Sequence, residues 1–248
     1  MRLLILGGTT EASALARHIA GRNDLMPVLS LAGRTRNPVT PSIPHRMGGF
    51  GGVPGLKTYL TENKINAVVD ATHPFAAQMS FNAADACRDL TLPLVQFSRA
   101  PWRPAKDDRW LPVPDMAAAA QALGAEPRRV LLTVGGLQLA AFVAALQHHY
   151  VIRTIDPPEV AAALPDHRLI LARGPFALED EIALMRDERI DVLVTKNSGG
   201  SATEAKLEAA RTLGIAVVMV ERPETAGVPA LDSLDAVMGW IEDHRPAP

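Results

Sequence analysis

Aliphatic residues in this chain come in short continuous runs, and this feature limits the fold more than any other. The runs lie at Leu3–Leu6, Val28–Ala32, Ala67–Asp70, Leu94–Phe97, Val130–Val134, Tyr150–Thr154, Leu169–Ala172, Val192–Thr195 and Val217–Val220. A strand with one face in water alternates apolar and polar residues, whereas a strand covered by helices on both faces does not. The runs therefore predict buried parallel strands.

Between many of these runs, apolar residues recur at the spacing of a helix. The expected helices are Glu11–Ala20, Ala76–Arg88, Leu137–Leu146, Glu179–Arg189, Thr203–Thr212 and Leu234–His244. An alternation of strands and helices is typical of α/β folds with mainly parallel sheets.

One stretch rich in proline and charge, Ala100–Asp115, interrupts this alternation. Proline lacks a backbone N–H and fixes φ, so this stretch is unsuited to a regular central element. We interpret it as a crossover between two α/β domains, residues 1–110 and residues 111–248. Gly-Gly pairs follow expected strands in both halves, which indicates two related halves with a cleft between them.

Composition excludes several classes of protein. The single cysteine, Cys87, rules out an internal disulfide and any multi-cysteine metal site, and no metal is expected. A net charge of −2 and an aromatic content of 4% do not favour binding to nucleic acid. No run approaches the roughly 18 apolar residues of a membrane helix, and no secretory signal pattern opens the chain. We therefore expect a cytoplasmic protein without a membrane or nucleic-acid partner.

The stretch Gly7-Gly8-Thr9-Thr10-Glu11 joins the first expected strand to the first expected helix. Glycine lets the backbone approach a phosphate, and a helix N-terminus offers N–H groups and partial positive charge. Thr9 and Thr10 are expected to donate hydroxyl groups or to cap the helix. Because the G-x-G-x-x-G fingerprint is incomplete, two interpretations stay open: a nucleotide site, or a tight capped turn without a ligand.

The residues after the second expected strand bear on which nucleotide such a site would take. NAD sites usually place an acidic residue there for the ribose 2′-hydroxyl. The stretch Ser30–Pro38 has no acidic residue but contains Arg34 and Arg36, and a guanidinium matches the geometry of a phosphate. This pattern favours NADPH, and the alternative is a pair of solvated arginines.

A third turn, with the sequence DATHPFA, follows the run that ends at Asp70. Ligands bind doubly wound sheets at the carboxyl ends of their strands. Thr72 is expected to cap the next helix, with Pro74 in its first turn. His73 is the candidate proton donor or ligand contact. The alternative is a well-capped turn with a structural histidine.

In the second half, a group of polar residues and glycines follows the run Val192–Thr195. The group consists of Lys196, Asn197, Ser198, Gly199 and Gly200. Ser201 and Glu204 then have the spacing of a capping box. This composition predicts a pocket for an anion or a cofactor, and the alternative is a capped loop with an exposed lysine.

Arginine follows several of the expected strands. The residues are Arg99, Arg103, Arg153, Arg173 and Arg222. Because a guanidinium pairs well with a carboxylate, repeated basic strand ends indicate a polyanionic substrate, most simply a polycarboxylate. Several of these arginines are still expected to be ordinary surface residues.

Seven stretches, taken in order, resemble the precorrin-6A reductase family of cobalamin biosynthesis. They read LILGGTTEA, LAGRT, DATHPFA, SRAPW, TVGG, TKNSGG and VVMVERP, and they extend over residues 3–223. The ordered set is specific, particularly DATHPFA together with TKNSGG.

The resemblance implies a monomeric enzyme with two Rossmann-like domains and a cleft. It also implies a reaction in which NADPH delivers a hydride to one C=C bond of the precorrin-6A macrocycle, a tetrapyrrole polycarboxylate, to give precorrin-6B. The implied cofactor loops map onto Gly8-Thr9-Thr10-Glu11, Gly33-Arg34-Thr35 and Thr72-His73-Pro74. The Lys196–Gly200 turn is implied to contact cofactor or substrate.

Three alternatives stay open. A related reductase acts on the cobalt-containing substrate of the anaerobic branch, and a non-enzymatic NADP-sensing module would bind NADPH without consuming it. Water is the rival of His73 as the source of the proton. A short-chain dehydrogenase is disfavoured, because neither Tyr59 nor Tyr150 has a lysine four residues later.

Overall fold

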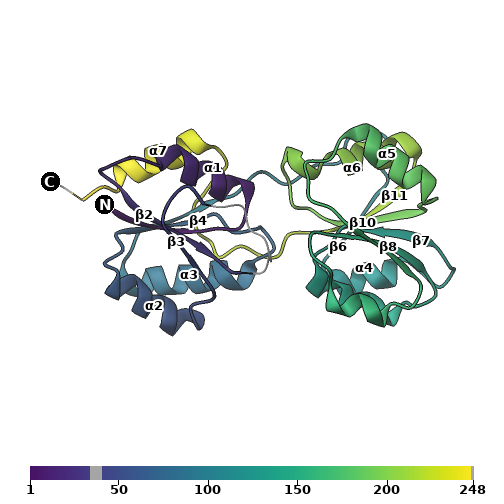
Figure 1. Ribbon diagram of the computed structural model, residues 1–248, viewed down its shortest axis with the longest axis horizontal. Helices are drawn as coiled ribbons and strands as arrows, with labels where there is room; N and C mark the ends of the chain where they lie inside the picture. Colours follow the sequence, from purple (N-terminus) through teal and green to yellow (C-terminus); the bar gives the residue numbers. More distant parts are fainter. Residues whose placement is uncertain (34–40, 247–248) are drawn as a thin grey trace. The chain divides into compact units, whose positions relative to one another are not determined.

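The computed structural model of the chain describes residues 1–33 and 41–246. The chain divides into two compact units, shown in Figure 1. Unit 1 consists of Met1–Ala100 together with Pro223–Pro248, and unit 2 consists of Pro101–Arg222.

Unit 1 contains a parallel sheet in the order β12-β5-β4-β1-β2-β3. Its strands are β1 (Arg2–Leu6), β2 (Met26–Leu31), β3 (His45–Met47), β4 (Ala67–Asp70), β5 (Leu94–Phe97) and β12 (Ala230–Leu231). Its helices are α1 (Thr10–Ile19), α2 (Gly52–Glu62), α3 (Ala77–Leu90) and α7 (Leu234–Asp243). The chain first runs outward from β1 to β3 and then returns to β4 on the other side of β1, so the topological switch point lies between β1 and β4.

The two faces of this sheet explain the continuous apolar runs. Leu3 and Ile5 pack with residues of α1 and α7, whereas Leu4 and Leu6 pack with residues of α2 and α3. Figure 1 shows these helix pairs on opposite faces of the sheet. Both sets of strand side chains are buried, and each buried leucine contributes about 1.5–3 kcal/mol.

Unit 2 contains a second parallel sheet, in the order β6-β11-β10-β7-β8-β9. Its strands are β6 (Trp110–Val113), β7 (Arg129–Leu132), β8 (His149–Thr154), β9 (His167–Leu171), β10 (Val192–Lys196) and β11 (Ala216–Val220). Its helices are α4 (Met116–Ala122), α5 (Leu178–Asp187) and α6 (Ala205–Leu213), with 3₁₀ helices η1 (Gly136–Ala144), η2 (Glu159–Ala163) and η3 (Ser201–Thr203). The switch point of this sheet lies between β7 and β10.

The predicted fold class, α/β with parallel sheets in two Rossmann-like halves, is confirmed. Two local predictions differ from the structure. The expected helix at Leu137–Leu146 is the 3₁₀ helix η1, and the proline-rich stretch supplies strand β6, which pairs only with β11 at one edge of its sheet. Pro112 is tolerated in β6 because one side of an edge strand forms no hydrogen bonds with a neighbouring strand, so no backbone N–H is needed there.

The division into units also differs from the predicted domains, residues 1–110 and residues 111–248. Unit 1 ends its first segment at Ala100 and regains the chain from Pro223. The physical reason is pairing and packing: β12 pairs with β5, and Val237 and Ile241 of α7 lie in the same core as α1. The C-terminal segment is therefore part of the first sheet and not of the second.

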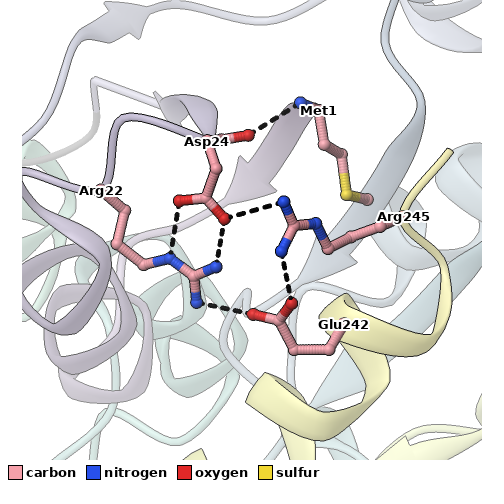
Figure 2. Close-up of polar contacts among 5 residues, drawn as sticks. All are labelled: Met1, Arg22, Asp24, Glu242 and Arg245. Carbon is pink, nitrogen blue, oxygen red and sulfur yellow. Dashed lines mark hydrogen bonds and ion pairs between the residues drawn. The ribbon is translucent and has the colours of Figure 1, made fainter. Parts of the chain in front are cut away.

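A cluster of four charged side chains, which we call the α7 cluster, ties α7 to the turn before β2 (Figure 2). Arg22 binds both Asp24 and Glu242, with Nη1 2.6 Å from Glu242 Oε1. Arg245 binds the same two carboxylates, at 3.1 Å and 2.9 Å. The amino group of Met1 donates to the carbonyl of Asp24 over 2.9 Å. The hydrogen bonds from Arg22 lower the pKa of Asp24 to about 2.

Among the described residues, the helices are too short or too polar to cross a bilayer. Over the same residues, no group of three or more His, Cys, Asp or Glu side chains could hold a metal ion.

Candidate functional site

Two turns meet at the carboxyl edge of the unit 1 sheet, where β1 and β4 lie side by side at the switch point. The first turn follows β1 and begins at Gly7, and the second follows β4 and begins at Ala71. The hydroxyl of Thr9 joins them by donating to the carbonyl of Ala71 over 2.7 Å. Two stretches about sixty residues apart in sequence thus form one surface at the edge where α/β sheets bind ligands.

The two glycines of the first turn have different roles. A Cβ on Gly7 would lie 2.6 Å from Leu29 Cδ1 and 3.3 Å from Ala12 Cβ, so Gly7 allows close packing inside the unit. Gly8 has φ +116°, and a Cβ there would meet nothing within 4 Å. Gly8 therefore meets a conformational requirement and leaves the backbone open to a close ligand.

Thr9 is the N-cap of α1, as predicted, and its Oγ1 accepts from the N–H of Ala12 over 3.1 Å. Since this hydroxyl also donates to Ala71, it is committed to the turn itself. Thr10 is exposed, and its Oγ1 donates to Glu11 Oε2 over 3.1 Å. The sequence signal for the cap was correct, and the structure adds the bridge between the two turns.

Glu11 and Arg99 form an ion pair at this edge. Arg99 follows β5, and its Nη1 lies 2.6 Å from Glu11 Oε2. The two side chains are 18% and 19% exposed. The sequence assigned Glu11 to the cofactor and Arg99 to the substrate, but the structure pairs them with each other. Arg99 therefore neutralises a carboxylate in the first turn of α1, where an anionic ligand would otherwise be repelled.

The turn after β4 is organised by Asp70. Its Oδ1 accepts from the N–H of Thr72 over 3.0 Å and from the Thr72 hydroxyl over 2.7 Å. Asp70 and Thr72 are 3% and 8% exposed. Thr72 does not cap α3, whose N-cap position is Ala76, so that part of the prediction is wrong. A short side chain that binds a neighbouring backbone N–H favours a turn over a helix start.

His73 lies on the same turn, and its ring is partly buried. Its Nδ1 accepts a hydrogen bond from the N–H of Phe75 over 3.2 Å. A nitrogen that accepts carries no proton, so this bond selects the neutral tautomer with the proton on Nε2. The ring is thus arranged to donate a hydrogen bond through Nε2.

Gly33 has φ +72° just after β2. The predicted phosphate ligands Arg34 and Arg36, and Thr35 between them, lie outside the described residues. Their assignment to the cofactor therefore stays a prediction.

Sequence reasoning missed Arg46, a residue of β3 that is paired in register with Ser30 of β2. Its Nη1 donates to Ser30 Oγ over 2.7 Å and to the carbonyl of Gly48 over 2.9 Å, and its Nη2 donates to the carbonyl of Gly49 over 2.9 Å. The guanidinium also lies 4.0 Å from the centre of the Phe50 ring. Arg46 therefore fixes the glycine-rich loop between β3 and α2 against the carboxyl end of β2.

The sequence signal for this loop is its composition, Gly48-Gly49-Phe50-Gly51-Gly52. Four glycines in five residues directly before a helix indicate a strand-to-helix turn with unusual φ angles. Gly48, Gly51 and Gly52 indeed have positive φ. Gly49 does not, and a Cβ on it would meet nothing within 4 Å, so the surrounding fold gives no reason for a glycine there.

In unit 2, the Lys196–Gly200 turn lies at the switch point between β7 and β10. The amide of Asn197 is occupied: Oδ1 accepts from the N–H of Trp102 over 2.8 Å, and Nδ2 donates to its carbonyl over 3.1 Å. Arg222 donates to the carbonyls of Asn197 and Ser198 over 2.9 Å and 3.1 Å. Asn197 and Arg222 therefore shape the turn, and their contact with substrate stays a prediction.

The glycines of this turn have positive φ, +69° at Gly199 and +78° at Gly200. The expected capping box is absent. Helix α6 begins at Ala205, and the side chain of its N-cap residue, Glu204, makes no capping hydrogen bond. The 3₁₀ turn η3 at Ser201–Thr203 takes the place of a direct helix start. Lys196, half-buried at the end of β10, is the cation of this turn.

Arg153, predicted to bind substrate, makes its contacts inside unit 2. It is 8% exposed and binds Glu181 of α5 with both of its terminal nitrogens. Its guanidinium also lies 3.9 Å from the centre of the Phe176 ring. A bidentate pair of this kind, buried under a helix, joins β8 to α5. Arg173, in contrast, is exposed just after β9.

Fold and site together define a class: doubly wound α/β proteins, which bind ligands at the switch point of the sheet and here have a glycine-threonine turn there. Residues 2–242 match the family model described as "Precorrin-6x reductase CbiJ/CobK". The chain belongs to this family.

Individual relatives agree over the full length of the chain. It is 51% identical to the precorrin-6A reductase of Rhodobacter capsulatus, covering 100% of this chain and 98% of the relative. It is 49% identical to that of a Sinorhizobium species, covering 97% and 92%. A solved structure, "CobK precorrin-6A reductase", superposes with a TM-score of 0.93 at 50% identity, covering 100% of this chain and 98% of that one.

A more distant relative has a different name. The "Cobalt-precorrin-6A reductase" of Synechocystis is 29% identical over 98% of this chain and 97% of the relative.

Proposed function

We propose that this protein reduces one C=C bond of precorrin-6A with NADPH and so forms precorrin-6B. The observation that carries the proposal is the full-length similarity, near 50% identity, to proteins named precorrin-6A reductase. The enzyme class, an oxidoreductase, follows from that family.

The first turn of unit 1 fits the pyrophosphate of a dinucleotide. Gly8 leaves open space beside its backbone, and α1 directs its N-terminus at the same place. The pairing of Glu11 with Arg99 removes the charge that would oppose a phosphate. Partial positive charge at the helix end and neutralised acid nearby together favour an anion.

Selection of NADPH over NADH is assigned to Arg34 and Arg36, with Arg46 as a positioning residue. Arg46 contacts Ser30 and Gly48 and so fixes the backbone beside the end of β2. A guanidinium pair there would hold the 2′-phosphate as a fork.

When bound, the nicotinamide supplies the hydride, and the chain binds and orients the reacting atoms. The tautomer of His73 argues against this residue as the proton source. To serve as the proton source, the ring would first have to carry a proton on each nitrogen. The proton on Nδ1 would then face the N–H of Phe75, which donates to that nitrogen. We therefore assign the proton to water and give His73 the role of a hydrogen-bond donor through Nε2.

The substrate carries acetate and propionate groups, which call for cations. Arg173 is the exposed arginine of the predicted set that follows a strand of unit 2, and Lys196 lies at the end of β10. We assign both to the carboxylates of the substrate. Arg99, Arg153 and Arg222 have the structural contacts described above and contribute through the shape of the site.

The cobalt-containing substrate is the second candidate. The identity of 29% to a cobalt-precorrin-6A reductase, against 51% to a precorrin-6A reductase, favours the metal-free substrate. The test is the oxidation of NADPH by the purified protein with precorrin-6A and, in parallel, with its cobalt complex. We expect faster turnover of the metal-free ring. Faster turnover of the cobalt complex would instead identify the cobalt-containing ring as the substrate.

The same assay separates an enzyme from an NADP sensor. A sensor would bind NADPH tightly and leave it unoxidised with either ring. NADH is included as a control, because equal rates with both nucleotides would contradict the role given to Arg34 and Arg36.

A further inference from the structure

Three large aliphatic side chains are exposed at the carboxyl edge of the unit 2 sheet. Leu137 is 73% exposed, Ile155 is 48% exposed and Leu171 is 52% exposed. We call these three residues the apolar edge row. Single exposed leucines are ordinary on a protein surface, but apolar residues gathered at a ligand-binding edge mark an interaction site.

Topology places the three residues at or after the carboxyl ends of three neighbouring strands. Leu137 is the second residue of η1, which follows β7, Ile155 follows β8 directly, and Leu171 ends β9. β7 pairs with β8, and β8 pairs with β9. Since all these strands are parallel, their carboxyl ends lie at one edge of the sheet.

Register and packing place the backbone segments that carry the three residues next to one another. Leu171 pairs with Thr154, so Ile155 lies one residue beyond the same rung. A Cβ on Gly136 would lie 2.9 Å from Pro158 Cβ, so the start of η1 is held against the loop that carries Ile155. Leu137 is the next residue along η1. The row therefore starts at the switch point of unit 2 and extends to the edge strand.

Basic residues stand at both ends of the row. Lys196 ends β10, which neighbours β7 on the side away from β8, and Arg173 comes two residues after Leu171. Along the edge the order is cation, three aliphatic side chains, cation, with the half-buried carboxylate Asp156 directly after Ile155. Three strand spacings of about 4.8 Å make this about 14 Å in extent.

We propose that the apolar edge row seats the flat apolar face of the macrocyclic substrate, with its carboxylates directed at the basic residues on either side. This inference rests on the proposed function and deepens it. The match is one of charge and polarity: a tetrapyrrole polycarboxylate has an apolar ring and an anionic rim, and the edge presents the complementary pattern. A nucleotide has its charge at the phosphates and fits the glycine-threonine turn of unit 1 instead.

The test is equilibrium binding of precorrin-6A, followed by the absorbance of its ring, to the full chain and to Leu137→Ser, Leu171→Ser and the double variant. Leu111→Ser is the matched control, because Leu111 is 49% exposed on β6 at the other edge of the same sheet. All these side chains are exposed, so folding should be retained, which the thermal unfolding midpoint checks.

We expect the double variant to bind precorrin-6A about tenfold or more weakly, with the Kd for NADPH unchanged. Leu137→Met, which keeps an apolar side chain of similar volume, should bind like the parent. A shift in the double variant no larger than that of Leu111→Ser would overturn the inference, and so would an equal loss of NADPH binding.

Failure of the inference and failure of the proposed function are separable. If the parent protein turns over precorrin-6A but the row variants bind it normally, the inference fails and the function stands. If the parent binds the ring through the row but never reduces it, the function fails and the inference stands. A parent that does not bind the ring overturns both.

Discussion

At the scale of single residues, the site depends on side chains whose hydrogen bonds are already made within the protein. His73 accepts from Phe75 through Nδ1, Thr9 bridges two turns, and Glu11 is held by Arg99. Such bonds hold backbone and side chains in place before a ligand arrives. Preorganisation of this kind lowers the cost of placing a cofactor against its substrate.

Variants of His73 separate hydrogen-bond donation from proton transfer. His73→Gln can place an amide N–H near the position of Nε2, whereas His73→Asn and His73→Ala cannot. We expect His73→Gln to keep kcat within about tenfold of the parent, and the other two variants to fall below it. Steady-state kinetics with saturating NADPH measures the difference. Loss of about 10²-fold or more in His73→Gln, together with loss of a pH limb, would instead make His73 the proton donor.

The pair Glu11–Arg99 should act on cofactor affinity. Arg99→Gln leaves the Glu11 carboxylate unneutralised beside the N-terminus of α1, so we expect the Kd for NADPH to rise about tenfold. The double variant Glu11→Gln/Arg99→Gln should recover most of the loss. The matched control is Lys57→Gln, which breaks an exposed pair with Asp89 elsewhere in unit 1. Additive effects in this double-mutant cycle would show that the two residues act independently.

At the scale of elements, the strand ends determine which turns can meet, and α7 completes the first sheet's helical cover. Val237 and Ile241 pack into the core beside Leu15 and Ile19 of α1. The α7 cluster adds a polar attachment at the end of the helix. An exposed cluster contributes less than the buried apolar face, and it depends on pH and salt.

The pH dependence of this attachment follows from Asp24. Its pKa in the folded protein is about 2, below the ordinary value of 3.8, because of hydrogen bonds from Arg22. A lowered folded pKa gives stability that is complete above about pH 3.8 and is lost as the pH falls through about 2. We expect Asp24→Asn to lower the melting temperature at pH 7 by no more than about 4 °C.

Calorimetry at several pH values tests this expectation. The difference between Asp24→Asn and the parent should shrink as the pH falls from 4 to 2, and it should also shrink in 1 M salt, where the Debye length is about 3 Å. A difference that stays constant over both series would mean that the cluster acts through packing and not through charge.

At the scale of the whole molecule, the sequence predicted the architecture because continuous apolar strands have few other solutions. It did not predict the return of the C-terminal segment, since β12 has only the two residues Ala230–Leu231 and leaves no periodic pattern. It missed α2 because the glycines around Phe50 resemble a loop. The Thr9 cap was predictable from local spacing.

The arginines of the site were the least predictable part. Arg153 and Arg173 both follow or end strands, but one is buried against Glu181 and the other is exposed. The difference arises from a partner on α5, 28 residues away in sequence, and strand-end position alone carries no information about it. The same limit applies to Asn197, whose amide is satisfied by the backbone of Trp102.

The central claim is that this protein transfers a hydride from NADPH to the ring of precorrin-6A, while the second hydrogen comes from a solvent-exchangeable position. The most direct measurement is mass spectrometry of the product formed with NADPH deuterated at the transferred position. With deuterated NADPH in ordinary water, we expect one deuterium in the product. With unlabelled NADPH in D₂O, we expect one deuterium at the other reduced carbon. A product without cofactor-derived deuterium, or no product at all, would contradict it.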